Sequence, residues 1–142
     1  MQEYTGFVRD NLFLFIGFFA VLGIIVWTEF NRFTRKYQVA SVNQAVKLLN
    51  DDKAVIVDVR EEREIIDGAI KDARHIPVSE FKGRLKELNK SKKHPVLVYC
   101  KTGARSGSAC KMLEAEGFEN VTSLEGGIVA WETANMPLSK KR

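Results

Sequence analysis

The sequence predicts an α/β domain with a mostly parallel central sheet flanked by helices, preceded by one N-terminal transmembrane helix. Apolar runs of strand length alternate with segments of helical periodicity, which predicts the α/β class. The runs are apolar throughout, as in parallel strands covered on both faces. Residues 11–28 carry no charged side chain, which predicts the transmembrane helix. We therefore expect a short N-terminal segment (1–10), the transmembrane helix (11–28), a basic juxtamembrane linker (29–37), the α/β domain (38–138) and a basic, mobile tail (139–142).

The transmembrane helix is expected from length as well as from composition. About 18 uncharged residues at 1.5 Å each give about 27 Å, close to the hydrocarbon thickness of a bilayer. Trp27 lies at the end of the segment, where membrane interfaces favour this residue type. A cleaved signal peptide is the competing interpretation, but the N-terminal flank carries Glu3 and Asp10 and no small-x-small cleavage site follows the segment.

Basic residues on the two flanks predict the orientation of this helix. Arg32, Arg35 and Lys36 follow the apolar segment, whereas only Arg9 precedes it. By the positive-inside rule the C-terminal domain is cytoplasmic and the N-terminus lies outside.

The strands and helices of the domain follow from apolar runs and from their stop signals. Ser41 is expected to cap the first helix, and Gly117 to end the helix that follows the fourth strand. Strands are expected at 37–39, 54–59, 73–76, 95–99 and 121–124. Helical segments are expected at 41–49, 61–67, 79–88, 104–116 and 126–136.

Composition limits the functions that this chain can have. The net charge of +4 is modest, and no Lys/Arg run is interleaved with aromatic residues, so no nucleic-acid partner is expected. The two cysteines are ten positions apart and form neither a disulfide framework nor a zinc site, and a reducing compartment fits them. We expect no metal and no cofactor.

The most informative stretch is Cys100-Lys101-Thr102-Gly103-Ala104-Arg105-Ser106, which joins a strand to a helix. The first turn of a helix leaves amides unpaired and favours negative charge. Small residues at 103 and 104 allow successive amides to point at the Cys100 sulfur, and two basic side chains add positive charge. These effects favour a thiolate, although an ordinary buried cysteine at a strand end is the alternative.

Several segments together resemble the rhodanese-like sulfurtransferases, and the resemblance covers roughly residues 38–138. With the N-terminal helix, the chain is similar to a membrane-anchored single-domain rhodanese of bacteria, which implies the inner membrane. The matching segments are Val57-Asp58-Val59-Arg60, Gly68-Ala69-Ile70, His75-Ile76-Pro77, the stretch 100–106, Gly117-Phe118 and the segment from Leu124 to Trp131.

The resemblance implies transfer of sulfane sulfur from a small anionic donor such as thiosulfate, through a persulfide on Cys100, to cyanide, a thiol or a protein acceptor. Membrane lipid and a membrane protein are further expected partners. Asp58 and Ser106 are expected to support the cysteine loop, with Asp58 holding it by hydrogen bonds. The residues expected to bind substrate are Arg60, Lys101, Thr102, Gly103, Ala104 and Arg105.

Some alternatives stay open. The segment 68–72 lacks the family's Pro-Gly turn, so its local conformation is in doubt. Related phosphatases have five residues between Cys and Arg, whereas four separate Cys100 from Arg105, which favours sulfur over phosphate. Arg105 has the alternative of a structural ion pair with an acid such as Asp58 or Glu125. Cys110 is expected to be a small buried residue of its helix, with a resolving-thiol role as the alternative. The whole protein has the alternative of a membrane-tethered interaction or sulfide- and redox-sensing module with little turnover.

Overall fold

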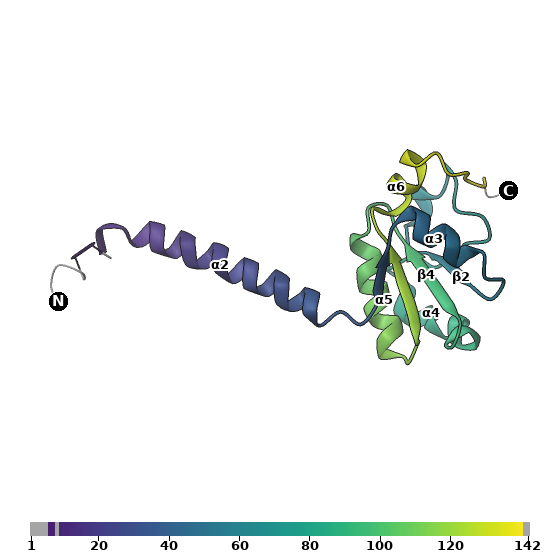
Figure 1. The fold of residues 1–142 in the computed structure, drawn as a ribbon, viewed down its shortest axis with the longest axis horizontal. Coiled ribbons are helices and arrows are strands. Elements are labelled where there is room, and N and C mark those ends of the chain that lie inside the picture. Colours follow the sequence, from purple (N-terminus) through teal and green to yellow (C-terminus); the bar gives the residue numbers. More distant parts are fainter. Residues whose placement is uncertain (1–5, 8, 141–142) are drawn as a thin grey trace. The chain divides into compact units, whose positions relative to one another are not determined.

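The computed structural model describes residues 6, 7 and 9–140, and the chain forms two compact units, one ending at Arg35 and one beginning at Lys36. Figure 1 shows the long helix α2 of the first unit and the sheet and helices of the second. What the sequence suggests for residues 1–5, 8, 141 and 142 lies outside the described residues.

Helix α2 (Leu12–Phe33) has 22 residues, none of them buried, and is long and apolar enough to cross a membrane. It continues past Thr28, so the first five residues of the expected linker are helical. Glu29 and Arg32 form an ion pair of 3.7 Å one turn apart on this extension. The Thr34 amide donates to the Phe30 carbonyl at 3.1 Å, which closes the last turn. Polar residues thus extend the helix without lengthening its apolar segment.

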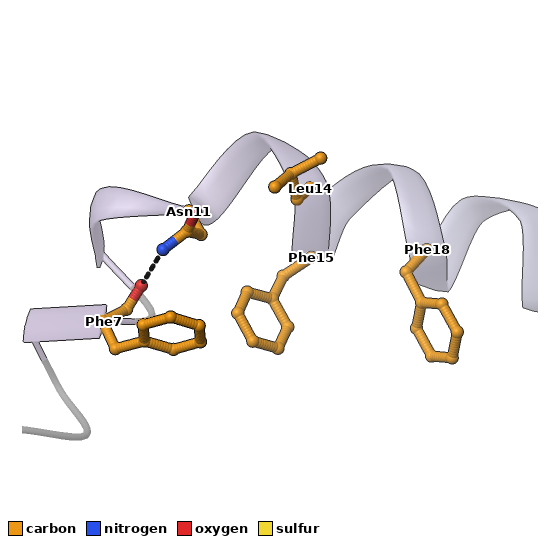
Figure 2. A pocket seen from close by; sticks show the side chains of 5 residues that line it. All are labelled: Phe7, Asn11, Leu14, Phe15 and Phe18. Atoms are coloured by element: carbon orange, nitrogen blue, oxygen red, sulfur yellow. Dashed lines mark hydrogen bonds between the residues drawn. The ribbon is translucent and has the colours of Figure 1, made fainter.

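Aromatic side chains gather at the start of α2. A recess at this end has a volume of about 470 Å³. Figure 2 shows the side chains that line it, which are those of Phe7, Asn11, Leu14, Phe15 and Phe18. The side-chain amide of Asn11 donates to the Phe7 carbonyl at 2.9 Å, which removes one polar group from the recess. Four of the five side chains that line the recess are therefore apolar.

The second unit is built on a five-stranded sheet in the order β1-β5-β4-β2-β3, and every pair is parallel. This confirms the expected α/β class and the mostly parallel sheet. The strands are β1 (Gln38–Ala40), β2 (Val55–Asp58), β3 (Arg74–His75), β4 (Pro95–Tyr99) and β5 (Asn120–Leu124).

Alternate residues of the central strands fill two separate cores. Val57, Val96 and Val98 point to one face, where they pack with α4 (Phe81–Arg84), the 3-10 helix η2 (Leu85–Ser91) and α5 (Ala104–Ala115). Leu97 and Tyr99 point to the other face, against α3 (Val42–Leu49) and α6 (Gly127–Thr133). Because both faces are covered, β4 and the first three residues of β2 have no charged side chain.

Two helical segments differ in detail from the expectation. The segment 61–67 contains only the short 3-10 helix η1 (Glu62–Glu64). The helix expected from Ser79 to Leu88 is a short α-helix followed by the 3-10 helix η2, whose buried residues are Leu85, Leu88 and Ser91. Their spacing of three matches the three residues per turn of a 3-10 helix. Ser41 caps α3 with a reciprocal capping box to Gln44, as its position predicts.

The C-terminal segment is attached to the domain, so the expectation of a mobile tail is wrong at Ser139. Ala69 and Ser139 exchange backbone hydrogen bonds of 2.9 and 2.8 Å as an isolated antiparallel bridge. The turn at 68–72, which lacks Pro-Gly, is made with Asp72 in a left-handed conformation with φ 61°. Aspartate tolerates that conformation better than most residues do.

Candidate active site

The candidate site lies where β2 and β4 end side by side. Asp58 is in register with Tyr99, and the Val59 amide donates to the Tyr99 carbonyl at 3.0 Å. Residues 58–60 and the loop that begins at Cys100 therefore share the carboxyl edge of the sheet, as expected for a ligand site in an open parallel sheet.

The loop from Cys100 to Gly103 bends back on itself before α5 begins. Gly103 has φ 104°, in the region that favours glycine. Its amide donates to the Cys100 sulfur at 3.0 Å. Cys100 itself is only 1% exposed, so its sulfur is held beneath the loop.

The surroundings of Cys100 stabilise a thiolate. Burial raises the pKa of the thiol, but the amides of Ser106, Gly103 and Thr102 and the Ser106 hydroxyl outweigh it, so the pKa is lowered. The amide donors therefore reach as far as Ser106, in the first turn of α5. They are dipoles of the backbone for the most part.

Helix α6 fixes the orientation of the loop. The amides of Ile128 and Val129 donate to the carbonyls of Cys100 and Lys101, at 2.9 and 3.2 Å. Gly127 has φ 58° and packs directly against the backbone of Lys101. A Cβ at this position would lie 2.6 Å from both the carbonyl carbon and the carbonyl oxygen of Lys101. The carbonyls of Cys100 and Lys101 are thus turned toward α6 and away from the sulfur.

Ser106 supports the loop from below. It is fully buried, and its hydroxyl donates to the Gly103 carbonyl at 2.9 Å. The Ser123 hydroxyl lies 2.8 Å away from it, and the Cys100 sulfur 3.8 Å. Ser106 thus ties the first turn of α5 to β5 beside the sulfur.

Asp58 supports a different part of the site from the one expected. Its carboxylate accepts from the Arg60 backbone amide at 3.0 Å, from the Arg60 side chain and from the Tyr99 hydroxyl at 2.8 Å. Arg60 follows β2, and Tyr99 is the last residue of β4, so neither partner belongs to the loop that begins at Cys100. The expectation that Asp58 holds the cysteine loop itself is therefore wrong, because the loop is held by α6 and Ser106.

Arg60 is largely occupied by structural contacts. Its Nη2 donates to Asp58 at 2.7 Å and to the Gly68 carbonyl at 2.8 Å, while Nη1 donates to the Glu64 carbonyl at 3.0 Å. The guanidinium also lies 5.6 Å from the centroid of the Tyr99 ring. Burial lowers the pKa of Arg60, but the Asp58 carboxylate more than offsets it, so the net pKa is raised. A contact of Arg60 with substrate stays a prediction.

Arg105 forms an ion pair with Glu64. The two terminal nitrogens of Arg105 donate to the two carboxylate oxygens of Glu64 at 2.6 and 2.7 Å. The sequence offers an ion pair of Arg105 with an acid such as Asp58 or Glu125 as an alternative; the structure contains an ion pair of this kind, but its acid is Glu64. The residues are 41 positions apart, so no local pattern indicates the pair, although Glu64 follows β2 and thus lies near the correct edge of the sheet.

A pocket of about 370 Å³ lies beside the cysteine loop. It contains basic and acidic side chains and two apolar ones. Its lining residues are Arg60, Arg63, Glu64, Asp67, Lys101, Ile128, Val129 and Glu132. Of the expected substrate-binding residues, the structure thus brings Arg60 and Lys101 to one pocket, while Thr102 and Ala104 are exposed on the loop above Cys100.

Cys110 and Trp131 belong to the core. Burial raises the pKa of the Cys110 thiol, and this residue is fully buried. Trp131 is 3% exposed and its indole donates to the Pro137 carbonyl at 3.1 Å. In the described part of the chain, no three His, Cys, Asp or Glu side chains converge as metal ligands would.

Comparison with known proteins identifies a family and several relatives, one of which aligns over nearly the whole of this chain. A family model described as rhodanese-like domain matches residues 41–134. The uncharacterized protein YibN of Escherichia coli (strain K12) is 32% identical over 139 residues, which cover 97% of each chain. A protein named sulfurtransferase from Allochromatium vinosum is 34% identical over 101 residues, covering 71% of this chain and 92% of its own.

Solved structures agree on the fold. A rhodanese-related protein from Thermoplasma volcanium matches with a TM-score of 0.67 and 28% identity, over 74% of this chain and all of its own. The region that matches the family model contains the cysteine loop, Asp58, Arg60, Glu64 and the start of α6.

Proposed function

The chain belongs to the rhodanese-like domain family, and on that premise we propose that it transfers sulfane sulfur through a persulfide on Cys100. Relatives named sulfurtransferase support the reaction class. Thiosulfate is the donor proposed for assay, and a thiol, a protein thiol or cyanide is the acceptor.

The reaction has two steps. The Cys100 thiolate attacks the outer sulfur of thiosulfate, a new S–S bond forms on Cys100, and sulfite leaves with the electron pair of the broken S–S bond. The acceptor, a thiolate or cyanide, then attacks the outer sulfur of the persulfide, and the Cys100 thiolate leaves. Both forms of Cys100 carry negative charge, which the loop amides stabilise.

One observation carries this proposal: the Gly103 amide donates to the Cys100 sulfur at 3.0 Å in a loop whose dipoles lower the pKa of that thiol. A structural cysteine needs no such donors, and Cys110, buried in the same unit, has a raised pKa. The nucleophile is therefore assigned to Cys100 and not to Cys110.

The test is thiocyanate formation from thiosulfate and cyanide by the full chain in mild detergent. Cys100→Ser is expected to abolish turnover, whereas Cys110→Ala is the matched control and is expected to retain most of it. Equal turnover in Cys100→Ser and the unchanged protein would refute Cys100 as the nucleophile.

We further propose that α2 anchors the protein in the bacterial inner membrane, with the N-terminus outside and the catalytic unit in the cytoplasm. The 22 residues of α2 span about 33 Å as a helix, and the basic residues follow its apolar segment. The relative YibN aligns over 97% of this chain, so most of the N-terminal segment is shared with it.

Two measurements test the anchor. The intact mass of protein from membranes separates a retained helix from a cleaved signal peptide. Protease added to spheroplasts is expected to leave the C-terminal unit intact, and digestion of that unit from outside would contradict the orientation.

A second candidate function is a tethered interaction or sensing module with little turnover. The 1% exposure of Cys100 favours it, because a buried sulfur exchanges slowly with small molecules. Persulfidation of Cys100 without multiple turnovers, together with co-purification of a membrane protein, would support this alternative over the enzyme.

A further inference from the structure

We propose that Glu64 is a specificity-determining residue, which neutralises the positive charge at the cysteine loop and so disfavours dianionic sulfur donors relative to monoanionic organic ones. The inference rests on the proposed sulfur transfer at Cys100. It concerns the charge of the donor that the site accepts, and Glu64 acts both by occupying Arg105 and by its own negative charge.

The geometry of the ion pair is the first support. Both terminal nitrogens of Arg105 face Glu64, at 2.6 and 2.7 Å. This two-point arrangement is the one that a guanidinium offers to the oxygens of a carboxylate, phosphate or sulfonate. The carboxylate of Glu64 therefore occupies the edge of Arg105 that an anionic donor would otherwise bind.

The position of Glu64 is fixed. Its Oε2 also accepts from the Glu61 backbone amide at 2.9 Å, in the capping box of η1. Hydrogen bonds from Arg105 lower the pKa of Glu64 to about 2, so the carboxylate is ionised across the physiological range. A donor therefore has to displace a charged group that has three hydrogen bonds, and protonation does not remove it.

The wider charge distribution is the second support. Glu64 also interacts electrostatically with Lys101, the other cation of the loop. The adjoining pocket contains three basic side chains and three acidic ones, so it has no excess positive charge for a dianion. The apolar side chains of Ile128 and Val129 line the same pocket and suit an organic substituent on the donor.

Two donors that carry the same transferable sulfur differ in their net charge. Thiosulfate is a dianion, and methanethiosulfonate is a monoanion in which a methyl group replaces one charged oxygen. In both, the S–S bond breaks and the leaving group, sulfite or methanesulfinate, departs with the electron pair. Only thiosulfate brings the second charge that Glu64 repels.

The test is steady-state sulfur transfer to cyanide by the full chain in detergent, with Glu64→Gln compared with the unchanged protein. Gln keeps the size of the side chain and an oxygen acceptor for the Glu61 amide. Removal of one charge close to the donor is expected to lower KM for thiosulfate about tenfold. KM for methanethiosulfonate is expected to fall by less than about threefold, and kcat for either donor to change little.

Glu62→Gln is the matched control, because it removes the same charge from an exposed position of the same 3-10 helix. It is expected to leave both KM values unchanged. An unaltered or raised KM for thiosulfate in Glu64→Gln, or an equal fall for both donors, would overturn the specificity role. A merely structural role would reduce activity and could not improve KM for one donor.

The dependence of KM for thiosulfate on ionic strength is a second test of the role of Glu64, and it does not require the two proteins to be equally stable. In the unchanged protein KM for thiosulfate is expected to vary little between low and moderate ionic strength, whereas in Glu64→Gln it is expected to rise with salt. Equal salt dependence in the two proteins would overturn the inference. Absence of transfer from both donors, with no persulfide on Cys100, would instead overturn the proposed function.

Discussion

The amide of Ile128 donates to the carbonyl of Cys100 at 2.9 Å, so the first turn of α6 is hydrogen-bonded to the cysteine loop. A helix start offers amides without intrahelical partners, and here the Cys100 and Lys101 carbonyls accept from the amides of α6. These two carbonyls are thereby held away from the sulfur, to which the Gly103 amide donates. The charge on the Cys100 sulfur therefore depends on a helix that begins 27 positions later in the sequence.

Gly127→Ala is expected to damage this contact. A Cβ at this position would lie 2.6 Å from the carbonyl group of Lys101, and the backbone has φ 58°. We expect a loss of about 2–4 kcal/mol of unfolding free energy and most of the sulfur transfer. Thermal unfolding and thiocyanate formation measure the two effects.

Gly83→Ala is the control for that substitution. Gly83 lies in the short helix α4, and no atom lies within 4 Å of a Cβ built there. Alanine is expected to leave activity unchanged and to alter stability by less than about 1 kcal/mol. Equal stability and activity of Gly127→Ala and Gly83→Ala would contradict the account of α6.

Tyr99→Phe tests the buried polar network that aligns β2 with β4. The Tyr99 hydroxyl donates to Asp58 at 2.8 Å and accepts from the Ile70 amide at 3.1 Å, and the residue is fully buried. Removal of the hydroxyl leaves the Ile70 amide unpaired. We therefore expect the free energy of unfolding, measured with a denaturant, to fall by about 2 kcal/mol. Sulfur transfer at a temperature where the variant is folded should change less than about twofold, because Tyr99 does not face the sulfur. Unchanged stability would contradict the assigned network.

The pH dependence of Cys100 alkylation tests its electrostatic environment. Iodoacetamide reacts with the thiolate, so the rate should reach a plateau at high pH and fall tenfold per pH unit below the Cys100 pKa. Because the folded-state pKa is lowered, half-maximal reactivity is expected below the ordinary value of about 8.5. Peptide mass spectrometry separates Cys100 from Cys110.

The lowered pKa also has a consequence for stability. The thiolate stabilises the folded state at pH values above the unfolded pKa, and this contribution is lost as pH falls through the folded pKa. In the alkylation experiment, a half-maximal rate for Cys100 at a pH equal to or above the ordinary thiol pKa would contradict the role of the loop amides.

The sequence predicts the features that depend on local pattern. Apolar runs indicate the central strands, a capping serine indicates the start of α3, and the small residues after Cys100 indicate a loop that can turn its amides inward. The carboxyl edge of the sheet then follows from the topology rule for parallel strands.

Contacts between distant segments are the part that sequence reasoning misses. Glu64 and Arg105 meet only because η1 and α5 both begin at the same edge of the sheet, and other acids near that edge are equally plausible from sequence alone. The role of α6 in orienting the loop depends on its packing distance, which only a glycine at 127 permits. Ser139 is held by backbone atoms, which carry no side-chain signal.

The most direct test of the central claim is mass spectrometry of the full chain after brief exposure to thiosulfate and removal of excess donor. The account predicts that the protein gains the mass of one sulfur atom, that fragmentation places it on Cys100, and that cyanide removes it. A protein that gains no sulfur, or gains it on Cys110 while Cys100 stays unmodified, would contradict the account.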